Sequence, residues 1–262
     1  MPETPGHIFI IFFLIPAIYG VKLGVEVFAR LVEISTPILA ILYTILFILV
    51  IPKLNFENIL PVMADGIKPV LAGSLQNLNF PYAQILPIAF FYKHMGSDAR
   101  KRNKCIKYIF IGVFMATLLL NIRSLASIMA FEEYTLKTLT FPPLSTIRII
   151  ELGDVIQRLD PFFYGIFYIN TFFKLVITFY VTCEIVSDLF NAGKPKDFAL
   201  PIALFIGVFM PYGIHRFDMI FQLIMPYFIL SLPLFFPIPI LLYITIKIKN
   251  KKDQESKETV NQ

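Results

Sequence analysis

The sequence contains no tryptophan, only two cysteines and little charge. Charged residues make up 16% of its 262 residues and hydrophobic residues 57%, whereas soluble domains hold about 25% charged and about 45–50% apolar residues. A soluble core of this size would not hide so much apolar surface, so the composition excludes an ordinary soluble domain. Because tryptophan is absent, tyrosine must supply most of any aromatic belt at a membrane surface.

Other absences exclude functional classes. The two cysteines form no CxxC motif and the three histidines are scattered, so we expect neither a metal site nor a cofactor. The sequence lacks a glycine-rich phosphate loop, an HExxH motif and a GxSxG motif, so we expect no enzyme. The basic residues lie between apolar runs rather than along one polar face, which argues against nucleic acid as a partner.

Several apolar segments are long enough to cross a bilayer, for which a helix needs about 20 mostly apolar residues. The candidates are roughly 7–28, 35–52, 68–92, 105–130, 161–190, 198–214 and 219–247. Prolines inside several of them predict kinked helices rather than soluble loops. We therefore expect an all-α integral membrane protein of about seven transmembrane helices. A single transmembrane domain would cover residues 1–250, in contact with membrane lipid, and a polar tail residues 251–262.

Basic residues between these segments predict the orientation. Those of the loop 93–107, Lys194, Lys196 and the tail fall on alternate loops, hence on one side of the membrane, as does Arg30 between the first two segments. The positive-inside rule assigns that side, and with it the C-terminus, to the cytoplasm. The opposite loop, 131–160, has helical apolar spacing in its second half. It predicts a short helix on the outer surface, as a lid or docking surface or as a structural cap.

The third segment is interrupted by six residues that do not suit a membrane helix: Asn79, Phe80, Pro81, Tyr82, Ala83 and Gln84. Proline donates no N–H and clashes with the preceding turn. At membrane depth an opened backbone is tolerated only where it lines an enclosed or watery cavity. Because a broken helix is the best sequence indicator of a transporter's substrate site, we predict that these residues bind a small molecule.

A lysine inside the fifth segment is the second candidate. Lys174 lies about 20 Å along the helix from Asp160. This is mid-membrane or slightly beyond, where a cation usually faces a cavity or a partner. Asn170 and Thr178 lie one turn to either side. This polar stripe either lines the substrate cavity or joins packed helices.

Four further charged residues are candidates for gates or ion pairs. Lys22 and Glu26 are four residues apart on one predicted helix face and can pair with each other, with snorkelling as the alternative. Glu184 lies near the inner end of the fifth segment. Arg123 lies towards the outer end of the fourth, where it is either a gate or an interface anchor.

Six short motifs follow one another along nearly the whole chain. They are Pro2-Glu3-Thr4-Pro5, Gly24-Val25-Glu26-Val27-Phe28-Ala29-Arg30, Pro52-Lys53-Leu54, Gly66-Ile67-Lys68-Pro69-Val70, Asn79-Phe80-Pro81-Tyr82 and Arg158-Leu159-Asp160-Pro161-Phe162-Phe163. In this order and spacing they resemble the spore germination permeases. These are the B subunits of the nutrient germinant receptors of endospore-forming bacteria, and they are similar to the amino acid–polyamine–organocation transporters.

The resemblance implies a LeuT-like fold of ten helices in two inverted repeats, whose first and sixth helices unwind at the binding site. On that pattern this chain resembles helices four to ten, and its broken third segment is the sixth. Asn170 and Lys174, on the eighth, would face the break. The first helix, which would supply half of the site, is missing, so we expect an N-terminally truncated chain: a misassigned start, a split product or a remnant.

Three functions stay open from the sequence. The first is a nutrient sensor in the spore inner membrane, a bacterial cytoplasmic membrane. It would bind a small nutrient, with an amino acid as the expected class, and trigger germination with the A and C type receptor subunits. The second is a proton-coupled amino acid permease, and the third a ligand-free assembly subunit or inactive remnant. Sensing and transport need the same gated cavity, so the sequence does not separate them.

Overall fold

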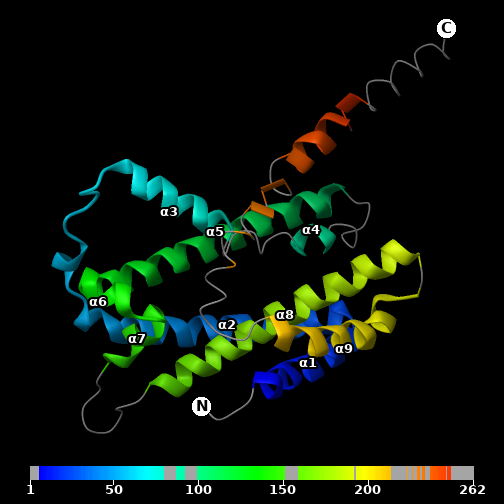
Figure 1. The fold of residues 1–262 in the computed structure, drawn as a ribbon, viewed down its shortest axis with the longest axis horizontal. Helices are drawn as coiled ribbons and strands as arrows, with labels where there is room; N and C mark the ends of the chain where they lie inside the picture. The colour runs from blue at the N-terminus through cyan, green and yellow to red at the C-terminus, as the bar shows by residue number, and fades with distance from the viewer. Residues whose placement is uncertain are drawn as a thin grey trace. The chain divides into compact units, whose positions relative to one another are not determined.

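A computed structural model describes residues 6–79, 87–91, 99–150, 159–191 and 193–213, together with short stretches between 223 and 248. All the secondary structure in these residues is helical (Figure 1). The chain divides into two compact units: Met1–Ala64 with Phe90–Met210, and Asp65–Ala89 with Pro211–Gln262. We call them unit 1 and unit 2. The expected single domain over residues 1–250 stays a prediction.

Four helices among the described residues are long and apolar enough to cross a membrane. They span Gly6–Leu23, Val25–Lys53, Asn103–Ala130 and Asp160–Phe190. The four match the predicted first, second, fourth and fifth segments. The predicted third and sixth segments contain α3 (Ile67–Asn79), α4 (Pro87–Phe91) and α9 (Pro195–Gly213). Most of the seventh lies outside the described residues, so the total of seven spans stays a prediction.

The first two helices meet at a single glycine. α1 (Gly6–Leu23) and α2 (Val25–Val50) are separated by Gly24, whose φ of 91° and ψ of 158° suit glycine alone. A Cβ at this position would meet nothing within 4 Å, so the constraint lies in the backbone and not in packing.

The predicted boundary between these two segments, with Arg30 in a loop, is therefore wrong. Arg30 lies inside α2 and its guanidinium bonds Glu26 Oε1 at 2.7 Å. Charges between two apolar runs suggest a loop, whereas an acid in the first turn of a helix with a base four residues later favours helix. The prediction that the internal prolines lie in helices rather than in loops is confirmed for Pro16 in α1 and Pro201 in α9, and the predicted kinks stay a prediction.

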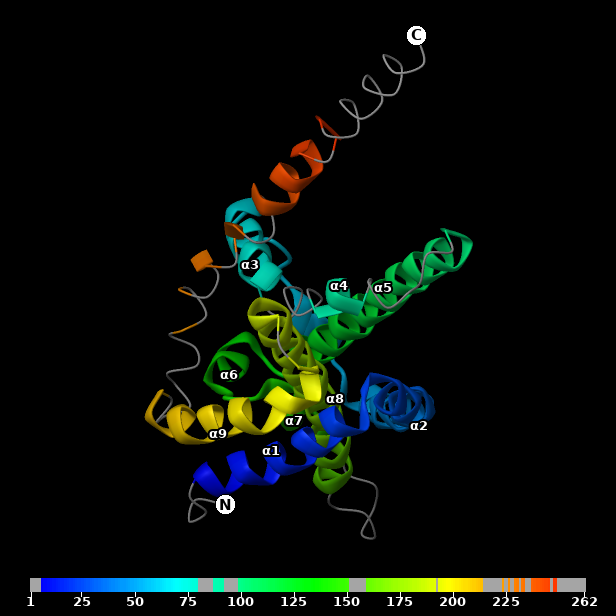
Figure 2. The ribbon, with the colours of Figure 1, turned by 90° about the vertical axis from the view of Figure 1, so that its right-hand side faces the viewer.

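The core of unit 1 is built around α8 (Asp160–Phe190), which packs against α1, α2 and α7 (Figures 1 and 2). Ala17 and Val21 of α1 and Val176 and Cys183 of α8 are almost fully buried. The helices can approach closely at Gly20, because a Cβ there would lie 3.0 Å from Val176 Cγ1. Small residues that allow such close approach are typical of helix contacts in membranes.

Unit 1 also contains α5 (Ala99–Ala130), which is one of the long helices, and the short helices η1 (Ile51–Lys53), η2 (Phe56–Ile59), α6 (Glu133–Thr138) and α7 (Pro142–Arg148). The last carbonyls of a helix lack partners within it. At the end of α5, Met129 O accepts from the Asn55 N–H at 3.0 Å and from Asn58 Nδ2 at 3.1 Å, so η2 is fixed to α5.

α7 lies where a short helix was predicted in the second half of the loop 131–160. Its Thr146 and Ile147 are buried, and Ile147 belongs to the core of unit 1. Arg148 Nε bonds Asp160 Oδ2 at 2.9 Å and ties the end of α7 to the start of α8. This packing is what the structural-cap alternative requires.

Candidate functional site

The broken segment lies largely outside the described residues. α3 ends at Asn79 and α4 begins at Pro87. Phe80, Pro81, Tyr82, Ala83 and Gln84 fall between them and are not described, so their role in binding a small molecule stays a prediction.

Lys174 lies on a groove inside unit 1, between α1, α8 and α9. The groove has a volume of about 380 Å³, which lies within the range of about 300–1,000 Å³ typical of small-molecule sites. It is lined by Leu14 of α1, Ile206 of α9 and six residues of α8: Thr171, Lys174, Leu175, Thr178, Phe179 and Thr182. Apolar walls with a few polar groups are typical of ligand sites.

The polar groups of this groove form one row along α8. Thr171, Lys174, Thr178 and Thr182 follow each other at three- and four-residue steps, which places them on one helix face. The hydroxyls of the three threonines donate to the carbonyls four residues earlier, at 2.8, 2.9 and 2.9 Å. Each hydroxyl hydrogen is therefore used within the helix, and the oxygen lone pairs remain as acceptors.

This row offers two kinds of contact to a ligand. The Lys174 ammonium is a donor that suits a carboxylate, and the threonine oxygens are acceptors that suit an ammonium or hydroxyl group. A zwitterion carries both groups. The groove is therefore chemically suited to an amino acid or a similar small polar molecule.

The structure agrees with the predicted polar stripe at Lys174 and Thr178 but not at Asn170. Asn170 does not line the groove, and its side-chain amide donates to Ile166 O at 3.0 Å. Thr171 and Thr182 line it instead, and sequence reasoning missed both. Their spacing to Lys174 and Thr178 is the signal that could have found them, but only the packing of α1 and α9 shows which side of α8 faces the groove.

The ion pair expected between Lys22 and Glu26 is wrong. α1 ends at Leu23 and α2 begins at Val25, so the two residues belong to different helices. The spacing of four residues places side chains together only on a continuous helix, which Gly24 interrupts. Glu26 pairs with Arg30 instead. Lys22 lies in the last turn of α1, where a cation interacts favourably with the helix dipole.

Glu184 is buried in α8, with 3% of its surface exposed, beside the fully buried Cys183. One turn further on, the Ser187 hydroxyl donates to Gly193 O at 3.3 Å, beyond the end of α8. An ionisable group at such a position in a membrane helix is a functional candidate by default.

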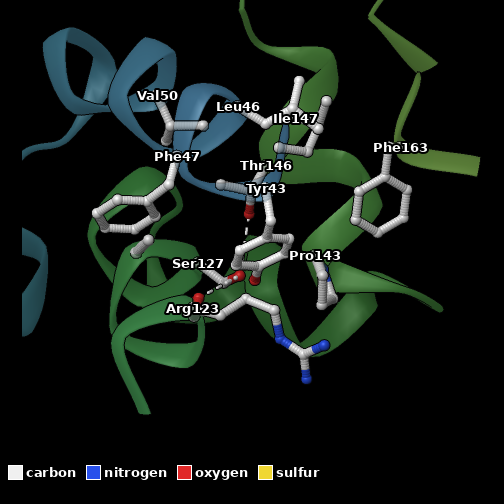
Figure 3. A pocket seen from close by; sticks show the side chains of 11 residues that line it. Tyr43, Leu46, Phe47, Val50, Arg123, Ser127, Pro143, Thr146, Ile147 and Phe163 are labelled. Atoms are coloured by element: carbon white, nitrogen blue, oxygen red, sulfur yellow. Dashed lines mark hydrogen bonds between the residues drawn. The ribbon is translucent and has the colours of Figure 1, made fainter. Parts of the chain in front are cut away.

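Arg123 lines a second, much smaller pocket, between α2, α5, α7 and α8 (Figure 3). The pocket has a volume of about 20 Å³. Its polar residues are Tyr43, Arg123, Ser127 and Thr146. The Ser127 hydroxyl donates to Arg123 O at 3.2 Å and accepts from the Thr146 hydroxyl at 3.0 Å. The Arg123 guanidinium points away from this pair (Figure 3).

A bundle that contains several helices long and apolar enough to cross a bilayer is the architecture of an integral membrane protein. The chain belongs to the spore germination protein family, whose family model matches residues 1–217. The resemblance inferred from the short motifs is thereby confirmed.

Three relatives from two organisms show how similar this sequence is to other members of the family. Spore germination protein KB of Bacillus subtilis (strain 168) is 30% identical over 207 residues, covering 77% of this chain and 54% of that protein. Spore germination protein YndE of the same organism is 29% identical over 212 residues, covering 79% and 56%. Spore germination protein XB of Bacillus anthracis is 24% identical over 163 residues, covering 61% and 43%.

No solved structure matches the chain. The chain spans about half the length of the curated relatives it matches. The arrangement of the whole protein as ten helices in inverted repeats therefore stays a prediction.

Proposed function

We propose that this chain is part of a B-type membrane subunit of a spore nutrient germinant receptor, and that it binds a small nutrient, with an amino acid as the expected class. Membership of the spore germination protein family supports the first part. The groove at Lys174 supports the second, because it combines one cation with a row of acceptors inside the bundle.

Binding would act by shifting a conformational equilibrium, since a ligand favours the packing of helices to which it binds more tightly. The groove is bounded by three helices, so its shape depends on how α1 and α9 lie against α8. The proposed output is passed to A and C type subunits in the spore inner membrane, and the chain itself carries out no chemical reaction.

The test replaces groove residues in spores of a host that carries the gene. Lys174→Gln removes the cation and Thr178→Val removes one acceptor at nearly constant shape. We expect both to weaken the germination response to nutrient, measured as dipicolinate release against the concentration of each common amino acid. Immunoblots of spore membranes show whether the variant protein is present in normal amounts.

Thr44→Val is the matched control. Thr44 is also a membrane-helix threonine whose hydroxyl donates to the carbonyl four residues earlier, at 2.7 Å, but it lies on α2 away from the groove. Normal protein levels with an unchanged response to every nutrient in both groove variants would overturn the assignment of the site. Tyr82→Ala and Asn79→Ala test the predicted half of the site in the same assay.

A proton-coupled amino acid permease is the second candidate, because the same groove would serve transport. Proteoliposomes separate the two. Uptake of labelled amino acid that an uncoupler abolishes identifies a permease, whereas ligand binding without uptake agrees with a sensor.

A further inference from the structure

One side of α5 carries exposed cations beside an exposed apolar stripe. Two lysines and a tyrosine are followed by three apolar residues at the three- and four-residue spacing of one helix side. All six side chains are exposed, and Tyr108 exposes 67% of its surface. We call this set the basic face of α5. It consists of Lys104, Lys107, Tyr108, Ile111, Met115 and Leu118.

The rest of unit 1 is tied to the opposite end of α5. The helix packs against η2, α6 and α7, and its bonds to η2 and α7 are made by Met129 and Ser127. The buried residues of α5, among those that the structure describes, are these two and Ala126. The basic face is therefore open to the surroundings of the protein, which for a membrane-spanning helix are lipid.

The cations of the basic face are not balanced by the chain around them. α5 contains no acidic residue, and none of the ion pairs among the described residues includes Lys104 or Lys107. Arg100, in the first turn, opposes the helix dipole and lies four residues before the like charge of Lys104. The stability of the helix therefore does not explain why positive charge is concentrated here, whereas an anionic partner does.

The position of the cations along the helix indicates this partner. α5 has 32 residues and is about 48 Å long, whereas the hydrocarbon core of a bilayer is about 30 Å thick. Counted back from Ala130, that core ends near Phe110, so Lys107 and Lys104 lie about 5 and 9 Å beyond it. Long lysine side chains at this depth reach the lipid headgroups. Tyr108 lies at the boundary, where tyrosine is enriched.

We propose that the basic face of α5 is a binding site for an anionic phospholipid. The phosphate lies between Lys104 and Lys107, and the acyl chains follow the apolar residues of the same face. Ammonium groups bind phosphate through charge-assisted hydrogen bonds, and basic clusters next to a membrane helix attract anionic lipids. An acidic protein segment would satisfy the charge but would leave the apolar stripe beside it unexplained. The site is independent of the proposed nutrient site.

The absence of tryptophan from the chain makes a single introduced tryptophan a specific reporter. Ile111→Trp places it on the basic face, and Phe12→Trp places the control on α1, at a residue that exposes 69% of its surface. Each chain is purified in mixed micelles, and brominated phosphatidylglycerol or phosphatidylcholine quenches its fluorescence. We expect phosphatidylglycerol to bind about fivefold more tightly than phosphatidylcholine in Ile111→Trp and equally in Phe12→Trp.

Charge variants in the Ile111→Trp chain test the two lysines. Replacing both Lys104 and Lys107 by Gln should remove the preference for phosphatidylglycerol. Replacing both Lys194 and Lys196 by Gln is the matched control, because it removes the same charge from two exposed residues near the start of α9 and should leave the preference unchanged. Circular dichroism verifies that each variant is folded.

Salt tests the same charges without a substitution of either lysine. Raising the ionic strength from about 0.1 to about 1 M shortens the Debye length from about 10 to about 3 Å, so the preference in Ile111→Trp should fall. Equal affinities for the two lipids in Ile111→Trp at low salt would overturn the proposal and leave this face to an acidic protein segment. A preference that persists without the two lysines would also overturn it.

Discussion

The groove at Lys174 and the pocket at Arg123 both place a cation inside unit 1, and hydroxyl groups in both donate to carbonyls of their own helix, but only those of the pocket also bond to each other. In the groove each threonine hydroxyl donates within α8 and leaves its oxygen as an acceptor. In the pocket the hydroxyls of Ser127 and Thr146 bond to each other across α5 and α7. The groove hydroxyls are therefore available to a ligand, whereas those of the pocket join helices. Substitutions of the groove hydroxyls should therefore change the response to ligand, whereas substitutions of the pocket hydroxyls should change the stability of the fold.

The largest effect on stability is expected at the close contact between α1 and α8, two of the helices that bound the groove. Gly20→Val would place side-chain atoms against Val176, whose Cγ1 would lie only 3.0 Å from a Cβ at position 20, and overpacking of this kind costs about 1–3 kcal/mol. Gly112→Val is the control, because a Cβ at Gly112 meets nothing within 4 Å. Unfolding in mixed micelles of detergent and dodecyl sulfate, followed by circular dichroism, measures both. Equal stability of the two variants would contradict the close contact between α1 and α8.

The hydroxyl pair of the pocket should give the next largest effect. Thr146→Val removes the donor to Ser127 in a buried place, and the loss of such a hydrogen bond costs about 0.5–1.5 kcal/mol. Combining it with Ser127→Ala should cost less than the sum of the two single substitutions. Thr36→Val is the control, because this exposed hydroxyl donates to Val32 O of its own helix. Strict additivity in the double-mutant cycle would show that the two hydroxyls are not coupled.

A groove threonine should show the opposite pattern. Thr171→Val keeps the shape of the side chain and removes an acceptor whose hydrogen bond lies within α8, so we expect the unfolding free energy to change by less than about 0.5 kcal/mol. The concentration of nutrient for half-maximal germination should rise in the same variant. A marked loss of stability with an unchanged nutrient response would reverse the contrast between groove and pocket.

An ion pair outside both sites should give the smallest effect. The hydrogen bond from Lys137, and then its charge, holds the pKa of Glu133 below the ordinary value of a glutamate. A carboxyl group whose pKa is lowered by folding stabilises the fold above its unfolded pKa, and this contribution is lost as the pH falls through the folded value. Since Glu133 is fully exposed, we expect Lys137→Met to change the acid limb of the stability profile only slightly. A large change there would show that α6 contributes more to the fold than an exposed surface helix should.

The long helices could be predicted from the sequence and their junctions could not. The predicted segments 105–130 and 161–190 agree closely with α5 and α8, because each is a long apolar run that begins near charged residues or a proline. The joint at Gly24 could not be predicted. A glycine between two apolar runs gives no local signal of a positive φ, and the charges that follow it suggest a loop where the structure has a helix.

The sequence predicted a polar stripe around Lys174 on α8, but it predicted only some of the residues that line the groove. Lys174 could be selected because a cation within an apolar membrane helix usually faces a cavity or a partner. Thr171 and Thr182 could not, since the side of α8 that faces the groove is decided by the packing of α9, the next helix, and of α1, which is far away in the sequence. Arg123 was a candidate from its depth alone, but the lack of a partner for its Nε becomes visible only when α2 and α7 are packed beside it.

The bond between Asn55 and Met129 has a consequence for hydrogen exchange. Asn55 stands outside any helix, between η1 and η2, where an amide would ordinarily exchange quickly with solvent deuterium. Its N–H is instead bonded to the carbonyl at the end of α5. Exchange then requires that contact to open, so the deuterium uptake of this one loop amide records how often the end of α5 separates from the segment that follows α2.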